Sequence, residues 1–426
     1  MTQQARWPRL FRVTRRFPGT PVADVGAATR EALAALNLEQ RIKPGARIVI
    51  TSGSRGVANI VATTAAVVAE VLRLGGEPIV IPALGSHGGG TPEGQLAVLT
   101  SYGITRQAVG APVVSQPEVV SLGETDGGVP LFADRLAAES DGLIVINRVK
   151  PHTDFTGELE SGPNKMLAIG LGKWHSASTC HSWFCEQGYD AILREVGGAL
   201  WQRLPMLGAV GLVENGHHET VRIGAIRPES PHADEAELLT EARRVFGYLP
   251  FSQLDVLLVD RLGKDVSGSG MDPNVTGADG CKLHGRRSTP FIWRICVRDL
   301  TEATHGNATG IGNADYALRR CVDKVDWAAT YTNTVAAASP EGARCPVVFD
   351  TDQAMLEAAF RTSGPRAAAS KRLVWIRDTL RVDDILVSEA LLDELRDEAV
   401  GAISPYESGL ELDDSGFLGQ PWAANR

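Results

Sequence analysis

The sequence places histidine, arginine and lysine side chains in short glycine- or proline-bearing segments that directly follow apolar runs. His87 lies in the segment GSHGGG (85–90), and His152 follows a proline. Imidazole gives or takes a proton near neutral pH, so two such histidines suit acid–base chemistry. Arg55, in SGSRG (52–56), can hold a carboxylate or phosphate through two parallel hydrogen bonds. Together these residues predict a site for a small anionic substrate, although each alone also fits a structural role.

Lys165 lies between the turn residues SGPN (161–164) and the apolar stretch MLAIGLG. A lysine in such a place loses contact with water, which favours the uncharged, nucleophilic amine. The alternative is an amine that extends to solvent along its apolar stem. His175 and His181 follow, but they are not spaced as i,i+3 or i,i+4, so they do not form a helical zinc pair.

The elements that would position these residues follow from the pattern of apolar runs. Runs at 46–51, 77–84 and 142–147 predict buried strands, and residues 57–76 predict a helix. Alternation of strand and helix predicts a parallel sheet, and ligands of such sheets bind beyond the carboxyl ends of the strands. At that edge we expect Arg55, His87, Lys150 and His152.

We expect two α/β domains, residues 1–250 and 251–426, with a Rossmann-like parallel sheet in the first. The limit lies within the proline-bearing sequence FGYLPFSQ, after which a new apolar strand is predicted at 254–260. The other elements predicted in the second domain are helices at about 314–338, 352–361 and 388–397 and a strand at about 372–378.

Composition excludes several classes of protein. The chain has 426 residues and a formal charge of −9, which disfavours a general nucleic-acid binder. No apolar run reaches the roughly 18–20 residues that span a bilayer, and the basic N-terminus lacks the apolar stretch of a secretory signal. We therefore expect a soluble, cytoplasmic protein that binds neither membranes nor nucleic acid and whose six cysteines are reduced.

Several motifs occur together and in a fixed order. They are GSHGGGT around His87, KPHTDFTGELESGPNKM around His152 and Lys165, and GLGKWHSASTCH, which ends at His181. In this order they resemble the nickel-pincer-nucleotide lactate racemase superfamily. The resemblance covers roughly residues 45–280 well and the last third of the chain in outline.

The resemblance implies a role for each matching residue. Lys165 would hold the pincer nucleotide covalently, and His181 would be the protein's ligand to nickel, a metal that imidazole suits. His87 and His152 would be the acid–base pair. The resemblance further implies substrate binding by Arg55 and Lys150 and cofactor binding by Ser54, Lys264, Asp272 and Asn274.

The implied activity is that of an isomerase, a racemase or epimerase of a 2-hydroxy acid, with the active site in the cleft between the domains. Hydride would pass to the cofactor while a histidine takes the hydroxyl proton. Residues 263–277 resemble a sister branch of the superfamily, and Thr153, Asp154 and Glu158 add polar groups near the site. We therefore expect a substrate larger or more polar than lactate.

The expected partners are that hydroxy acid and the enzymes that make the cofactor, and the sequence leaves a homodimer open. Two other functions stay open as well. One is an oxidoreductase on the same scaffold. The other is a non-catalytic binder of a nucleotide or anionic metabolite, in which Arg55 and the glycine-rich loops form an anion site.

Overall fold

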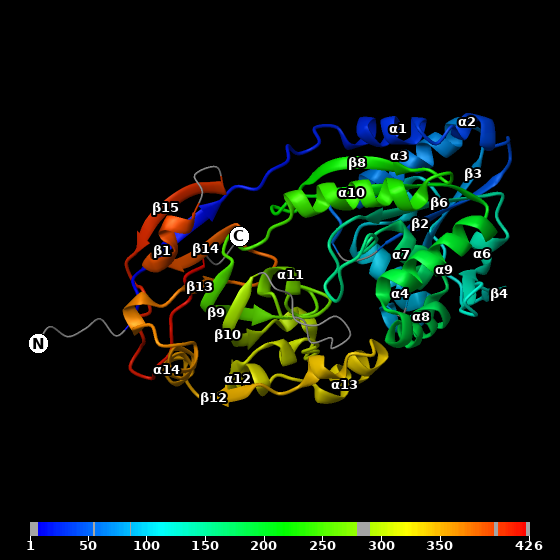
Figure 1. The fold of residues 1–426 in the computed structure, drawn as a ribbon. Coiled ribbons are helices and arrows are strands. Elements are labelled where there is room, and N and C mark those ends of the chain that lie inside the picture. Colours follow the sequence, from blue (N-terminus) through cyan, green and yellow to red (C-terminus); the bar gives the residue numbers. More distant parts are fainter. Residues whose placement is uncertain (1–6, 54–55, 86, 279–289, 396–398, 423–426) are drawn as a thin grey trace, which may run out of the picture. The chain divides into compact units, whose positions relative to one another are not determined.

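The computed structural model describes residues 7–53, 56–85, 87–278, 290–395 and 399–422 (Figure 1). The chain divides into two compact units. Unit 1 comprises Met1–Phe17 and Gly247–Arg426, and unit 2 comprises Pro18–Phe246. No helix within the described ranges is both long and apolar enough to cross a bilayer.

Unit 2 is built on a five-stranded sheet in the order β3-β2-β6-β7-β8. The first four of these strands are parallel, and β8 is antiparallel to β7. This confirms the α/β class and the largely parallel sheet expected from the sequence. The strands are β2 (Arg47–Ser52), β3 (Glu77–Pro82), β6 (Gly142–Arg148), β7 (Met206–Glu214) and β8 (Thr220–Ile226).

The strands of this sheet are apolar almost throughout because helices cover them. Ile48 and Ile50 of β2 belong to the same buried cluster as Val67 and Val71 of the following helix. The helices of unit 2 are α1 (Val25–Ala34), α2 (Leu38–Arg41), α3 (Ile60–Arg73), α4 (Pro92–Ser101), α5 (Arg106–Val109), α6 (Arg135–Ala138), α7 (Pro163–Lys165), α8 (Lys173–Gln187), α9 (Tyr189–Arg203) and α10 (Pro231–Val245).

Three smaller elements of unit 2 bear on the site. A hairpin of β4 (Val119–Glu124) and β5 (Pro130–Asp134) forms a separate two-stranded sheet. A short 3-10 segment, η1 (His87–Gly90), follows β3, and a π-helical turn, η2 (Met166–Leu171), follows α7. The segment η1 begins at His87, and η2 directly follows Lys165.

Unit 1 contains an eight-stranded mixed sheet in the order β12-β11-β10-β9-β13-β14-β1-β15. The domain limits expected from the sequence differ from the units at the start of the chain. There β1 pairs antiparallel with both β14 and β15, so the first residues join unit 1 (Figure 1). The strands are β1 (Leu10–Arg15), β9 (Gln253–Leu262), β10 (Phe291–Leu300), β11 (Tyr316–Leu318), β12 (Val347–Phe349), β13 (Leu373–Ile376), β14 (Asp384–Ser388) and β15 (Val400–Tyr406).

The single helix predicted at about 314–338 is wrong. The chain there forms β11, the short helix α12 (Arg319–Val322) and the helix α13 (Trp327–Ala336). The Asp326 side chain accepts a hydrogen bond from the amide of Ala329 and so starts α13 anew. The 3-10 segment η7 (Glu389–Glu394) lies where the sequence predicts a helix at 388–397. The other helical segments of unit 1 are α11 (Pro273–Thr276), α14 (Asp352–Thr362) and the 3-10 segments η3 (Glu302–Thr304), η4 (Ile311–Asn313), η5 (Pro340–Ala343) and η6 (Ala368–Ser370).

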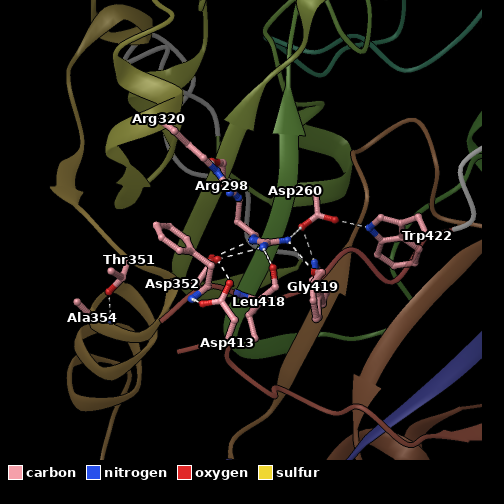
Figure 2. Close-up of polar contacts among 12 residues, drawn as sticks. Asp260, Arg298, Arg320, Thr351, Asp352, Ala354, Asp413, Leu418, Gly419 and Trp422 are labelled. Carbon is pink, nitrogen blue, oxygen red and sulfur yellow. Dashed lines mark hydrogen bonds and ion pairs between the residues drawn. The ribbon is translucent and has the colours of Figure 1, made fainter. Parts of the chain in front are cut away.

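A buried arginine ties the end of the chain to this sheet (Figure 2). Arg298 of β10 is fully buried and forms ion pairs of 2.6 Å with Asp260 and 2.8 Å with Asp352. Its guanidinium also donates to the carbonyl of Leu418 at 2.7 Å. Asp260 accepts further hydrogen bonds from the indole nitrogens of Trp375 and Trp422. The buried charge of Arg298 is therefore paired with groups from near the beginning (Asp260) and near the end (Leu418) of the segment Gly247–Arg426.

Candidate active site

The loop that carries His152 is closed at its base and fixed from within. Lys150 and Ser161 form an antiparallel bridge, with hydrogen bonds of 3.0 and 3.2 Å between their main chains. Inside the loop the buried carboxylate of Glu160 accepts the amide N–H of His152 at 2.5 Å. The same carboxylate pairs with Arg243 of α10 at 2.6 Å. The main chain at His152 is therefore held by a charge-assisted hydrogen bond.

The His152 ring contacts Lys165 directly. The ring is buried, its Nδ1 accepts the amide N–H of Asp154 at 3.0 Å, and its Nε2 is in hydrogen-bond contact with Nζ of Lys165. Because Nδ1 accepts a hydrogen bond, the proton of the neutral ring lies on Nε2. In that tautomer Nε2 can donate a hydrogen bond to the amine when the amine is uncharged. The contact brings the ring nitrogen and the lysine nitrogen directly together.

A run of aromatic rings connects His152 with His181. The His152 ring lies 4.4 Å from that of Phe155, and Phe155 stacks on Tyr189 at 4.7 Å with an angle of 8° between the rings. Tyr189 stacks in turn on Phe184 at 4.0 Å, and Phe184 lies 5.5 Å from His181. These five rings, which we call the ring stack, bring the two histidines into one apolar environment.

The chain between Lys165 and His181 has an unusual local conformation. The π-helical turn η2 follows Lys165 and ends at Gly172, after which Lys173 takes a φ of +54° and starts α8. A side chain at residue 172 would lie 2.7 Å from the carbonyl oxygen of Phe132, so glycine is needed there. Such π-helical turns are frequent at functional sites.

Lys173 itself is buried and paired. Its ammonium lies 2.5 Å from the carboxylate of Asp134, which is fully buried, and it also donates to the carbonyl of Gln116. Asp134 ends β5, so the ion pair anchors the beginning of α8 on the β4–β5 hairpin. Lys173 is not among the predicted site residues, because nothing in the local sequence identifies its distant acidic partner.

The loop of His87 packs against the same turn. Gly85 has a φ of +59°, and its amide donates to the carbonyl of Gly170 in η2 at 3.1 Å. Its own carbonyl accepts the side-chain amide of Gln95 at 3.1 Å. These bonds place the segment that carries His87, which is half-buried, beside the chain that connects Lys165 to His181.

The sequence of this part of the chain matches a known family. Residues 9–191 fit the family model described as the lactate racemase N-terminal domain. This part of the chain, a little under half of its length, is therefore similar to the N-terminal domain of lactate racemase. The lactate racemase apoprotein from Thermoanaerobacterium thermosaccharolyticum resembles the chain with a TM-score of 0.45 and 16% identity, over 66% of this chain and 69% of that one. Comparison with curated proteins gave no match.

The lactate racemase match contains His87, His152, Lys165 and His181 and indicates a racemase-type function, hence an isomerase. It ends before α10, which supplies Arg243 to the loop of His152. All four predicted residues lie in unit 2, where His152 contacts Lys165 and a helix beyond the matched residues supports the loop of His152.

Two other predicted site residues come shortly after β2 in the sequence. Ser54 and Arg55 lie outside the described residues. The described chain beside them is anchored, since the amide of Ala58 donates to Glu214 at 2.8 Å. Glu214 also pairs with Arg148 at 2.6 Å, at the carboxyl ends of β7 and β6. Sequence reasoning missed this pair, although Arg148 directly follows the predicted strand and so carried a signal.

Lys264, Asp272 and Asn274 belong to unit 1. The Lys264 ammonium donates to the side-chain oxygen of Asn333 in α13 at 2.5 Å. Asp272 caps the short helix α11 and accepts the main-chain and side-chain N–H groups of Asn274 at 2.9 and 2.8 Å. Within unit 1 these contacts hold Lys264 against α13 and hold Asn274 against Asp272 in the same short segment.

The donor set around Lys165 restricts the kind of metal site that fits. Among the described residues, no group of three or more histidine, cysteine, aspartate or glutamate side chains could hold a metal ion. Unit 2 instead offers the half-buried imidazole of His181 and, along the same chain segment, the amine of Lys165. One imidazole and one amine fit a metal that is brought by a covalently attached organic group and needs a single protein ligand.

Proposed function

We propose that the protein is a racemase or epimerase of a 2-hydroxy acid and carries a nickel-pincer nucleotide on Lys165, with His181 as the protein ligand to nickel. The observation that carries the proposal is the contact between Nζ of Lys165 and Nε2 of His152 inside a lactate racemase domain. It joins the amine that would be acylated to the imidazole that would exchange the substrate's proton. The match to the lactate racemase domain supports the reaction class.

The cofactor, when bound, supplies a hydride acceptor, so that the substrate carbon need not become a carbanion beside its carboxylate. The chain's own residues exchange protons and hold the substrate. For His152 to take the hydroxyl proton at Nε2, the neutral ring must carry its own proton on Nδ1, which the Asp154 carboxylate 3.8 Å away would accept. His87 serves the opposite face of the substrate, and Arg55 binds the carboxylate together with Lys150.

Acylation of Lys165 changes the surroundings of His152. An amide nitrogen has no basic lone pair, so it no longer accepts the Nε2 proton as the free amine does. Nε2 is then no longer held as a donor to Lys165, and with the ring proton on Nδ1 it can accept the proton of the substrate hydroxyl. Attachment of the cofactor and activation of the acid–base residue are therefore coupled in this proposal.

The residues expected to favour a polar substrate differ in their surroundings. Glu158 is exposed and pairs with Arg194 at 3.3 Å, on the outside of the loop. Thr153 is buried beside His152, and the Asp154 carboxylate lies 3.8 Å from Nδ1 of His152. We propose that Thr153 and Asp154, rather than Glu158, contact the substrate's extra polar groups.

The test is the mass of the intact protein after co-expression with the enzymes that make the cofactor. We expect an added mass of nucleotide size that a peptide map assigns to Lys165 and that is absent from Lys165→Ala. Lys43→Ala, which replaces an exposed lysine, is the matched control and should keep the adduct. The loaded protein should racemise polyhydroxy or dicarboxylic 2-hydroxy acids faster than lactate.

Two outcomes would contradict the proposal. An adduct on another residue would remove Lys165 from its role. No adduct at all, with metabolite binding unchanged in His87→Ala, would instead support a non-catalytic binder of an anionic metabolite.

A further inference from the structure

A buried carboxyl on α10 supports the chain segment that carries Lys165. Glu235 is fully buried, and its Oε2 accepts both the main-chain N–H and the side-chain N–H of Asn164, at 2.9 and 2.8 Å. The side-chain oxygen of Asn164 accepts the indole N–H of Trp201 in α9 at 2.9 Å. Asn164 directly precedes Lys165 and is itself fully buried. The helices α9 and α10 therefore both hold Asn164, the residue directly before Lys165.

The close approach of Glu235 depends on glycine. A Cβ atom on Gly162 would lie 2.6 Å from the carboxyl carbon of Glu235 and still nearer to Oε1. On the other side, a Cβ on Gly197 of α9 would lie 2.9 Å from the side-chain oxygen of Asn164. Both contacts are tighter than a side chain allows, so the sequence SGPNK and α9 are shaped to admit this network.

We propose that Glu235 is a positioning residue for Lys165: through Asn164 its carboxyl sets the direction in which the lysine leaves the main chain and so maintains the contact with His152. The inference rests on the proposed function of Lys165, because positioning matters only if that amine reacts. Glu235 lies beyond the residues matched by the family model, on an element that the motifs around Lys165 do not include.

The network needs an acceptor from Glu235 and not a negative charge. Both donors of Asn164 reach the same oxygen, and Oε1 has no hydrogen-bond partner among the described residues. Burial raises the pKa of Glu235 to about 7, while the two hydrogen bonds from Asn164 oppose that rise. A protonated carboxyl keeps the carbonyl acceptor on Oε2, and a glutamine presents the same acceptor. Glutamine is therefore expected to replace Glu235 without loss of positioning.

The test compares variants of the full chain by a signal from His152. In protein without cofactor, labelled with nitrogen-15 histidine, the ring signals of His152 report its tautomer and its contact with Lys165, with assignment by His152→Gln. We expect Glu235→Gln to leave these signals in place. Glu235→Leu should shift them, as should the milder Trp201→Phe, which removes only the indole N–H. Glu237→Gln, at an exposed position on the same helix, is the matched control.

The second readout is the fraction of protein that carries the adduct after co-expression. It should fall by about two- to ten-fold in Glu235→Leu, the effect of losing one or two hydrogen bonds, and recover in Glu235→Gln. Folded Glu235→Leu or Trp201→Phe with wild-type His152 signals would overturn the inference, as would Glu235→Gln that behaves like Glu235→Leu. If Glu235→Leu does not fold, Trp201→Phe and Glu235→Gln still decide the matter. Absence of any adduct in the wild type would contradict the proposed function alone, since the nitrogen-15 signals are measured without cofactor.

Discussion

At the scale of single residues, the hydrogen bond from the amide of Asp154 to Nδ1 decides which nitrogen of His152 meets Lys165. A main-chain donor cannot be removed by a change of pH, so in the protein without cofactor it favours the Nε2–H tautomer of the neutral ring. Glu160 fixes the main chain of the same residue through its own hydrogen bond. The loop thus orients the imidazole by its backbone and directs Nε2 toward Lys165.

Glu235 makes the stability of the protein depend on pH. Its pKa is raised by burial from the ordinary value of 4.5 to about 7, so the folded state binds the proton more tightly than the unfolded state does. The stabilisation is fully present below about 4.5 and is lost as the pH rises through about 7. For a shift of this size the loss is about 3 kcal/mol in the free energy of unfolding.

The measurement is urea unfolding at several pH values between 4 and 8, for the wild type and for Glu235→Gln. We expect the wild type to lose stability over this range relative to Glu235→Gln, which carries no proton to lose at this position. Equal pH dependence of the two proteins would show that the buried carboxyl is not protonated in the folded state. Glu237→Gln should follow the wild type.

At the scale of elements, the geometry between Lys165 and His181 depends on the break between η2 and α8. A lysine at φ +54° is strained by about 1–3 kcal/mol, and such strain persists only where surrounding contacts hold the residue. Lys173 is held by its ion pair with Asp134, which anchors the start of α8 on the β4–β5 hairpin. The ion pair therefore fixes where the helix that carries His181 begins.

We predict that Lys173→Met destabilises the protein by about 3–5 kcal/mol, because it leaves the carboxylate of Asp134 buried without its cation. Lys173→Met combined with Asp134→Leu should be less destabilised than the sum of the two single variants, since no lone charge remains. Both effects are measured by urea unfolding at pH 7.

The exposed Lys43→Met is the control and should change the stability by less than about 0.5 kcal/mol. A Lys173→Met protein of wild-type stability would mean that the ion pair does not anchor α8. A double variant as unstable as the sum would argue against coupling between the two side chains.

At the scale of the whole molecule, both ends of the described chain belong to unit 1. β1 lies between β14 and β15 in the sheet, and the segment around Leu418 accepts a hydrogen bond from Arg298 (Figure 2). Unit 2 is a single continuous stretch of chain inserted between these parts. The integrity of unit 1 therefore depends on residues from the beginning and the end of the sequence.

Removal of residues 412–426 should destabilise unit 1. Arg298 would lose the carbonyl of Leu418, and Asp260 would lose the indole of Trp422. A buried polar group left without a partner costs about 1–3 kcal/mol. We expect faster hydrogen exchange in β9 and β10, with exchange in β2, β6 and β7 unchanged.

Trp422→Phe removes only one of these hydrogen bonds and should give a smaller change in the same strands. Wild-type exchange in β9 and β10 of the shortened protein would show that the terminal segment does not stabilise the sheet. Faster exchange in unit 2 as well would show that the two units unfold together.

The sequence by itself determined the elements whose signals are local. Strands β2, β3 and β6 follow from continuous apolar runs, and the helix predicted at 57–76 corresponds to α3. The polar residues after those strands could be named for the same reason, because parallel strands bring their carboxyl ends to one edge of a sheet. The motifs around His152 and Lys165 then pointed to the lactate racemase family.

Only the tertiary structure decided the contacts between residues that are far apart in the sequence. No local pattern shows that Glu235 reaches Asn164, that Asp134 pairs with Lys173, or that β1 completes the sheet of unit 1. The helix predicted across β11 failed for a related reason, since a three-residue strand is fixed by its neighbours β10 and β12. Propensity and periodicity act over a few residues, whereas the burial of a charge or the pairing of a strand depends on which distant segments the whole fold brings together.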